Sequence, residues 1–287
     1  MSRAYCIVDV FTAAPLLGNP VAVVLDAEGL DTERMQAIAR WTNLSDTTFL
    51  LPPTIEGADY SLRIFTPRGE LPFAGHPTLG SAHAAIAAGR MPAGQARIVQ
   101  QCGVGRVPIA IEGEIPHRML RFDLPEGTVT ALAASDCDEL DAALGSPVLR
   151  AAAPSIINVG AVWIVAEVES PGALMAIRPD PARLAVLERG KAATGVSLFA
   201  RYDDGTLEVR SFAASSGIAE DPVCGTGNGS IALFRLHHGR VARGDGYGAR
   251  QGRCIGRDGH VHIAISTQDV IGVGGATVTV ARGTLDV

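Results

Sequence analysis

The sequence predicts an α+β protein built from two similar domains, each a β-sheet wrapped around one apolar central helix. Many short β-rich runs are spread over both halves of the chain. In each half, a glycine-containing turn precedes one apolar helix that is suited to burial. The strands are too many, and the long helices too few, for a doubly wound parallel sheet.

Composition restricts the class of protein. The chain has 287 residues, of which 47% are hydrophobic, so one large or two ordinary domains with substantial cores are expected. The net charge of −6 and the absence of a basic block argue against a nucleic-acid partner. No apolar run reaches the roughly 18 residues of a membrane span. We therefore expect no membrane partner.

The five cysteines are odd in number and scattered, and no Cys/His spacing is typical of a zinc site. The first residues enter a strand pattern directly, without the pattern of a signal peptide. Both observations predict a protein of the reducing cytoplasm, with no metal site.

The first half begins with strands. Asp31 or Thr32 is then expected to cap a helix in which Met35, Ile38, Ala39 and Thr42 share one face. A buried alanine-rich helix is expected at 77–88, ended by Gly89. The expected strands are 5–10, 21–25, 47–51, 60–65, 96–101, 106–111 and 119–124.

The segment Pro125 to Thr130 reads as a linker. We place the first domain at 1–117 together with a C-terminal strand at about 279–287, and the second at 118–278. The second half is expected to hold helices at 136–144, 171–177 and 181–189 and strands at 156–159, 161–168, 195–201 and 206–212. Residues 240–257 are interpreted as an exposed loop, and 259–287 as β-rich.

The stretch 220–230 (EDPVCGTGNGS) organises the second half. A strand leads to it, an apolar helix leaves it, and three alternate glycines leave the main chain accessible. Amides at the start of that helix suit a carboxylate or other small anion. The stretch 71–81 (LPFAGHPTLGS) has a similar pattern, and we expect the two to face each other across one active site.

Three side chains in these stretches have both functional and structural interpretations. Asp221 could orient a ligand or a histidine, or it could cap the following helix or close the turn. His76 could exchange a hydrogen bond as a neutral imidazole, or it could hold a turn. Cys224 could be an activated thiol at a helix start, or a small packed residue. The glycines lack the Lys-Ser/Thr of a P-loop, which argues against a nucleotide site.

Four motifs, in order along the chain, resemble those of the PhzF-like family of phenazine-biosynthesis isomerases and their relatives. They cover residues 9 to about 236. They are DVF at 9–11 with GNPVAV at 18–23, NLSDTTF at 43–49, RIFTP at 63–67 with ELPFAGHP at 70–77, and EDP at 220–222 with GTG at 225–227.

The resemblance implies a diaminopimelate-epimerase-like fold with the active site in the cleft between two domains. It also implies a cofactor-independent isomerase in a biosynthetic process, commonly a homodimer, acting on a small carboxylate. The best-known member isomerises trans-2,3-dihydro-3-hydroxyanthranilate by moving a proton along a conjugated system.

By the same resemblance, Asp46 is the catalytic acid/base, assisted by His76 and Asp221. The substrate-binding residues that it implies are Ser45, Gly75, Gly225 and Thr226. The family has glutamate where this chain has Asp46, so the carboxylate is retracted by one methylene. We expect a compensating shift of the backbone or substrate, or a different substrate. Two alternatives are an epimerase or racemase that uses Cys224 and a non-catalytic small-anion binding protein.

Overall fold

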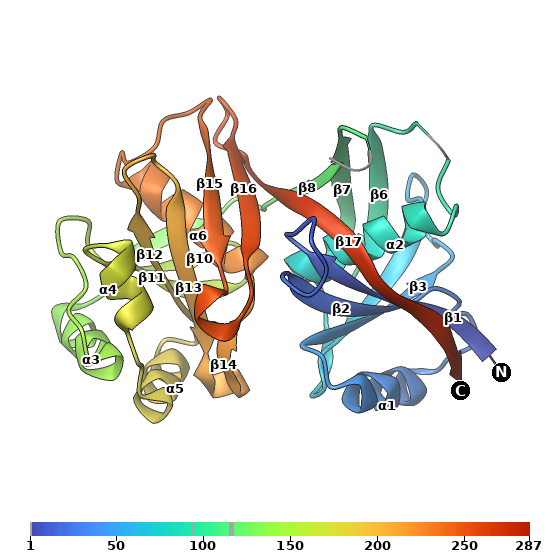
Figure 1. Ribbon diagram of the computed structural model, residues 1–287, viewed down its shortest axis with the longest axis horizontal. Helices are drawn as coiled ribbons and strands as arrows, with labels where there is room; N and C mark the ends of the chain where they lie inside the picture. Colours follow the sequence, from blue (N-terminus) through green and yellow to red (C-terminus); the bar gives the residue numbers. More distant parts are fainter. Residues whose placement is uncertain (1, 93, 115–117) are drawn as a thin grey trace. The chain divides into compact units, whose positions relative to one another are not determined.

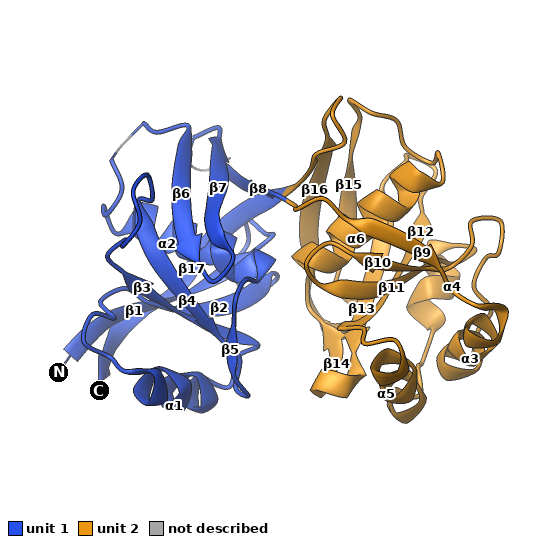
Figure 2. Cartoon of the chain, turned by 180° about the vertical axis from the view of Figure 1, so that it is seen from behind, with its two compact units in different colours: residues 1–123, 274–287 blue, residues 124–273 orange. Residues whose placement is uncertain are grey.

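The computed structural model describes residues 2–92, 94–114 and 118–287 of the chain. These form two compact units (Figure 2). Unit 1 comprises residues 1–123 and 274–287, and unit 2 comprises residues 124–273. Among the described residues, no helix combines the length and the apolar character needed to cross a membrane.

In unit 1, eight strands form a sheet that closes on itself (Figure 1). The strand pairs β1–β17, β1–β2, β3–β4, β6–β7 and β7–β8 are antiparallel, whereas β2–β3 and β4–β6 are parallel. A two-residue strand, β5 (Glu70–Leu71), is added to β4. In order around the barrel the strands are β17 (Ile271–Asp286), β1 (Ser2–Val10), β2 (Asn19–Val24), β3 (Asp46–Leu51), β4 (Tyr60–Phe65), β6 (Arg97–Cys102), β7 (Gly105–Glu112) and β8 (Met119–Asp123), which pairs with β17 again.

Helix α2 (Gly75–Ala87) lies inside this barrel, as its apolar sequence predicts. Every residue from Gly75 to Ala85 is buried, and the helix contacts β1, β2, β3, β4, β6 and β8. A Cβ atom at Gly80 would lie 2.3 Å from Val21 Cγ1, so only glycine allows this close approach of helix and strand.

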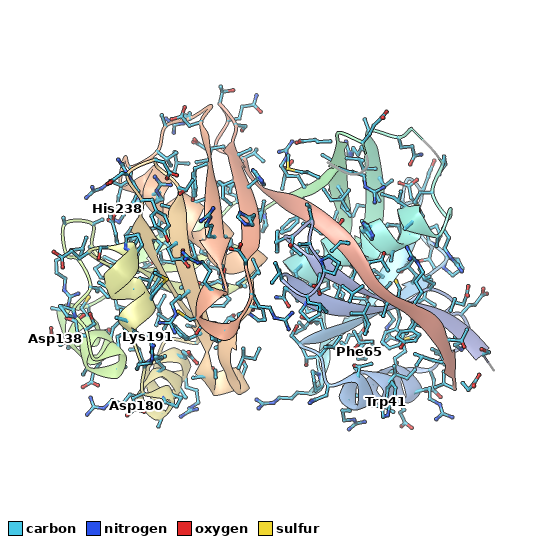
Figure 3. The ribbon with its side chains drawn as sticks, viewed as in Figure 1. Trp41, Phe65, Asp138, Asp180, Lys191 and His238 are labelled. Atoms are coloured by element: carbon cyan, nitrogen blue, oxygen red, sulfur yellow. The ribbon has the colours of Figure 1, made fainter. Side chains whose placement is uncertain are left out.

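Helix α1 (Thr32–Thr42) packs outside the barrel. The Asp31 side chain caps it by accepting a hydrogen bond from Arg34 N, and Met35, Ile38 and Ala39 are buried, as predicted. Trp41, on the same helix, is 72% exposed (Figure 3).

Unit 2 repeats the arrangement around α6 (Gly225–His237), which contacts β9, β10, β11, β12 and β16. Its strands pair in the sequence β9–β10–β11–β12–β13, and β13 then pairs with both β14 and β15, which pairs with β16. The strands are β9 (Thr128–Ala131), β10 (Ser155–Asn158), β11 (Val162–Glu167), β12 (Gly195–Arg201), β13 (Leu207–Ala213), β14 (Ile218–Asp221), β15 (Gly246–Gln251) and β16 (Gly259–Ile265).

Three further helices pack on unit 2: α3 (Ala134–Leu144), α4 (Pro171–Ala176) and α5 (Pro181–Gly190). The prolines at the starts of α4 and α5 follow the capping side chains of Ser170 and Asp180. Lys191, directly after α5, forms an ion pair of 2.6 Å with Asp136 of α3. Asp180 and Lys191 lie at the two ends of α5 (Figure 3).

Two expectations about unit 2 are wrong. The presumed linker 125–130 contains the start of β9, because its Thr and Val residues pair with β10. The presumed loop 240–257 contains β15, whose Gln251 is fully buried. Its many glycines and arginines obscured a strand that pairs on both sides.

The glycines of the stretch 220–230 also lie differently from the prediction. Gly225, Gly227 and Gly229 belong to the first turns of α6 and do not form a separate turn before it. A Cβ atom at Gly227 would lie 2.5 Å from Ser197 Oγ, and one at Gly229 would lie 2.2 Å from Leu124 Cδ1. The glycines therefore allow the start of the helix to pack tightly within unit 2.

Candidate active site

Asp46 is the first residue of β3 and is paired in register with Val21 of the parallel strand β2. Only 7% of its surface is exposed. The turn before it ends α1 at Asn43, whose left-handed conformation (φ 54°) is one that asparagine tolerates. The local sequence thus places a carboxylate where a loop enters the barrel, as predicted.

His76 is the second residue of α2 and is equally buried. Its ring makes a hydrogen bond with the Pro20 backbone, which can only accept through its carbonyl because proline has no N–H. Burial lowers the pKa of His76 to about 3. The neutral imidazole predicted from the sequence is therefore favoured, with desolvation as the dominant cause.

The Asp46 Oδ2 and His76 Nε2 atoms lie 3.7 Å apart. Within the described part of the chain, His76 Nε2 is buried without a hydrogen-bond partner, and so is Ser45 Oγ next to Asp46. Because His76 uses its other ring nitrogen toward Pro20, Nε2 carries a lone pair. Unsatisfied buried polar atoms are rare, so a ligand group that donates a hydrogen bond would suit His76 Nε2, which lies 3.7 Å from the carboxylate.

In unit 2, Cys224 is the N-cap of α6, and its sulfur accepts a hydrogen bond from Gly227 N at 3.3 Å. Among the hydrogen bonds of the described residues, none uses the backbone N–H of Gly225. This amide at the positive end of a buried helix is suited to an anion.

Asp221 ends β14 and is half-buried. Its Oδ1 accepts a hydrogen bond from Val223 N at 3.0 Å, which is the local turn contact considered as an alternative to function. Burial nevertheless raises the pKa of Asp221 to about 6, against the opposing effect of the hydrogen bonds from Val223 and Cys224. The carboxyl can therefore hold or release a proton near neutral pH.

Gln251 was missed by the sequence reasoning, and it fixes the backbone of this turn. Its Oε1 accepts hydrogen bonds from Cys224 N at 3.1 Å and Asn228 Nδ2 at 2.8 Å, and its Nε2 donates to Asp221 O at 3.0 Å. Two of these contacts join β15 to the start of α6, and the third joins it to the end of β14. No local motif marks this glutamine.

Trp163 of β11 was also missed. Its Nε1 donates a hydrogen bond of 3.1 Å to Thr226 Oγ1, and the indole is almost fully buried. This contact orients the Thr226 hydroxyl, which also lies 3.7 Å from Cys224 Sγ in a hydrogen bond that either group could donate. The sequence shows only a tryptophan within an apolar run. Because 63 residues separate the two partners, the sequence does not link Trp163 to Thr226.

The environment of Cys224 argues against a thiolate base. Burial, followed by the neighbouring Asp221 charge, raises the pKa of Cys224 well above its usual value, despite the hydrogen bonds that it receives. Its observed contacts are those of a helix cap.

The described residues contain no group of three or more His, Cys, Asp or Glu side chains that could hold a metal ion. In unit 1, the Asp46 carboxylate and the His76 imidazole lie close together. This set is suited to proton transfer.

Comparison with known proteins decides the family. A family model described as phenazine biosynthesis-like protein matches residues 8–283. The chain belongs to the phenazine biosynthesis-like, or PhzF, family.

Individual relatives match most of the chain. Trans-2,3-dihydro-3-hydroxyanthranilate isomerase from Pseudomonas aeruginosa is 34% identical over 259 residues, covering 90% of this chain and 88% of the relative. A protein named Antisense-enhancing sequence 1 from Schizosaccharomyces pombe is 37% identical over 231 residues, covering 79% and 78%. The Pseudomonas aeruginosa relative is named an isomerase, which supports an isomerase role for this chain.

Solved structures agree with the α+β fold of the PhzF family. A PhzF-family phenazine biosynthesis protein from Bacillus anthracis superposes with a TM-score of 0.88 at 24% identity, with 100% of both chains covered. A hydroxyproline epimerase from Agrobacterium vitis superposes with a TM-score of 0.68 at 13% identity, covering 99% of this chain and 92% of the epimerase. The chain thus has an α+β, epimerase-like fold, as the resemblance implied.

Proposed function

We propose that this chain is a cofactor-independent isomerase that moves a carbon-bound proton within a small unsaturated carboxylate. The Asp46–His76 pair carries this inference. Two buried groups converge at 3.7 Å, and the imidazole nitrogen that faces the carboxylate has no hydrogen-bond partner among the described residues. A substrate hydroxyl or amino group would satisfy this nitrogen.

In the proposed reaction, the Asp46 carboxylate takes a proton from a carbon next to the unsaturated centre. The C–H electron pair moves into the conjugated system and onto the substrate carboxylate. The resulting Asp46 carboxylic acid then returns the proton to a different carbon of that system. Atoms and electrons balance without an oxidant or co-reactant. His76 Nε2 accepts a hydrogen bond from a substrate hydroxyl or amino group and holds the substrate in place.

Residues of unit 2 are proposed to bind the polar groups of a substrate. The Gly225 amide and the Thr226 hydroxyl provide donors for a carboxylate, and Gly75 provides the corresponding amide at the start of α2. Asp221, with its pKa raised to about 6, would orient or protonate a basic substrate group. Ser45 Oγ, buried beside Asp46, would contact the substrate as well.

The substrate class is proposed from the relatives and from the presence of aspartate in place of glutamate at position 46. Trans-2,3-dihydro-3-hydroxyanthranilate is an unsaturated cyclic amino acid that carries a hydroxyl group, and related small carboxylates suit the same proton transfer. Since Asp46 is shorter than the glutamate that the family resemblance implies, we propose a substrate that approaches this carboxylate more closely. The homodimer implied by the resemblance and the cytoplasmic location predicted from the cysteines and the first residues are further predictions. They are checked by light scattering and by fractionation of the native cell.

The proposal is tested with Asp46→Asn, an isosteric change. Small unsaturated carboxylates are screened for thermal stabilisation, and hits are incubated in deuterated solvent with mass-spectrometric detection of deuterium uptake. Wild-type protein should incorporate deuterium and convert the substrate, whereas Asp46→Asn should bind without exchange. Asp26→Asn, which removes a surface carboxylate, should behave as wild type. Full exchange in Asp46→Asn would refute the assigned base, and binding without exchange by wild type would favour a small-anion binding protein.

A further inference from the structure

A second polar cluster lies in unit 1, around His83 near the middle of α2. The imidazole is buried, with Nδ1 2.8 Å from Thr277 Oγ1 and 3.0 Å from Arg118 Nη2, and with Nε2 2.9 Å from Thr279 Oγ1. We call His83, Arg118, Thr277, Thr279 and Arg282 the basic cluster. His83 is seven residues from His76, or roughly 10 Å along the helix, so the basic cluster is separate from the Asp46–His76 pair.

The contacts of His83 fix its tautomer. A guanidinium only donates hydrogen bonds, so Nδ1 must be the acceptor for Arg118 and the ring proton must be on Nε2. Nε2–H then donates to Thr279 Oγ1. Nδ1 has one lone pair, yet both Arg118 and the Thr277 hydroxyl approach it. The basic cluster therefore contains more donors than acceptors.

Positive charge is concentrated at the same place. Arg282 of β17 pairs in register with the buried Cys6 of β1, so the two side chains share one face of the sheet. Burial, Arg118 and Arg282 together lower the pKa of His83 to about 4. Both arginines are thus close enough to act electrostatically on the same imidazole.

Neither arginine is neutralised by a carboxylate. No ion pair joins Arg118 or Arg282 to an acidic group of the described residues. By contrast, Arg63, Arg210 and Arg243 each form close two-nitrogen contacts with a carboxylate. Burial lowers the pKa of Arg118, which means that its charge is desolvated without compensation.

We propose that the basic cluster binds a small oxyanion, with Arg118 and Arg282 as the charged donors and the Thr277 hydroxyl as a neutral one. Arginine forks match the oxygens of phosphate and carboxylate groups. Arg282 is exposed and Arg118 and Thr277 are half-buried, so an anion can reach them from solvent. The site does not depend on isomerase activity.

The test is a titration of the purified protein with inorganic phosphate at constant ionic strength, followed by calorimetry and by the ¹⁵N resonances of the histidine rings. Wild-type protein should bind one phosphate saturably, and the His83 resonances should show the Nε2–H tautomer and shift with phosphate. Arg118→Gln and Arg282→Gln should each weaken binding at least tenfold. Arg121→Gln, which alters a neighbouring arginine paired with Glu112, should leave binding unchanged.

Acetate and succinate titrations distinguish a carboxylate ligand from a phosphate ligand. Thr277→Val keeps the charge and the shape of the side chain and should weaken binding severalfold. Asp46→Asn should bind phosphate as wild type, which separates this site from the proposed isomerase centre. Failure of all three anions to saturate wild type, equal binding by the arginine variants, or unmoved His83 resonances would each overturn the proposal.

Discussion

Asp46 Oδ2 and His76 Nε2 face each other at 3.7 Å, a separation beyond hydrogen bonding. The arrangement follows from the fold, because the parallel pairing of β2 with β3 positions Asp46 while the Pro20 backbone at the start of β2 holds the His76 ring. With the imidazole neutral, both atoms are acceptors. A hydrogen-bond donor that enters between these two atoms could be bound by both.

Restoring the longer carboxylate tests whether this spacing is tuned to aspartate. Asp46→Glu moves the carboxyl group outward by one methylene within a buried site. Displacement by roughly 1 Å can reduce the rate by about a hundredfold, so kcat for the substrate identified by deuterium uptake should fall by one to two orders of magnitude. Steady-state kinetics of both proteins provide the measurement. A variant that matches or exceeds wild type would show that the site is built for the glutamate geometry.

The low pKa of His76 predicts a specific pH dependence of stability. The group is neutral in the folded protein down to about pH 3 but gains a proton near its ordinary pKa of 6.5 when unfolded. Its contribution to the free energy of unfolding is present above pH 6.5 and is lost as the pH falls toward 3. Between pH 7 and pH 5 the loss is about 2 kcal/mol.

This loss is isolated by urea unfolding of wild type and His76→Gln at the two pH values. The variant should lose about 2 kcal/mol less than wild type over this interval. His83 contributes with the same sign and Asp221 with the opposite sign, since its raised pKa favours the folded state at lower pH. Both remain in the variant and cancel in the difference. His260→Gln, at an exposed position, is the control and should follow wild type. Parallel curves for wild type and His76→Gln would contradict a strongly desolvated His76.

Gln251 is predicted to support both the stability of unit 2 and substrate binding. Gln251→Leu removes the acceptor for Cys224 N and Asn228 Nδ2 and the donor to Asp221 O in a fully buried place. Leaving such groups unsatisfied costs about 1–3 kcal/mol each, so the free energy of unfolding should fall by at least about 2 kcal/mol.

Steady-state values of KM and kcat test whether Gln251 positions the start of α6. Because it holds the start of α6 and not the Asp46 base, Gln251→Leu should raise KM more than it lowers kcat. Gln251→Glu retains an acceptor oxygen and should lie between wild type and Gln251→Leu. Gln36→Leu, which removes a single half-buried contact to Thr66 O, is the matched control and should cost under about 1.5 kcal/mol with unchanged KM. An effect of Gln251→Leu on kcat alone would contradict the positioning role.

The secondary structure was largely predictable because local patterns produced it. The Asp31 cap, the Pro171 and Pro181 helix starts and the apolar 77–88 segment each act within a few residues, and the corresponding helices α1, α4, α5 and α2 confirm them. The strand β15 was missed since its glycines and arginines weaken the alternation that marks a strand. Its pairing with both β13 and β16 supplies the stability that its own sequence does not indicate.

The site was predictable only in part, for a related reason. Asp46, His76 and Asp221 lie at element ends, where loops meet strands or helices, and sequence motifs mark such ends. Gln251 and Trp163 act on the start of α6 across 27 and 63 residues. No periodicity or cap pattern connects residues so far apart, and only the folded sheet brings them together. The same limit applies to the His83–Thr279 contact, which spans 196 residues.

The glycines of α6 supply a final prediction, because they are costly in a helix unless packing requires them. A Cβ atom at Gly227 would meet Ser197 Oγ at 2.5 Å, Ser211 Oγ at 3.0 Å and Cys224 Sγ at 3.2 Å. These short side chains cannot move far, so Gly227→Ala should displace the start of α6. We expect a loss of about 1–3 kcal/mol in the free energy of unfolding and weaker substrate binding.

Gly190→Ala is the matched control for this prediction. Gly190 ends α5, and nothing lies within 4 Å of an added Cβ atom there. Alanine in a helix is favoured over glycine by roughly 0.5–1 kcal/mol, so this variant should be as stable as wild type or slightly more so. Urea unfolding of the two variants compares them directly. If both alanines stabilise the protein, the first turn of α6 has room that the structure does not show, and glycine there serves access to the main chain and not packing.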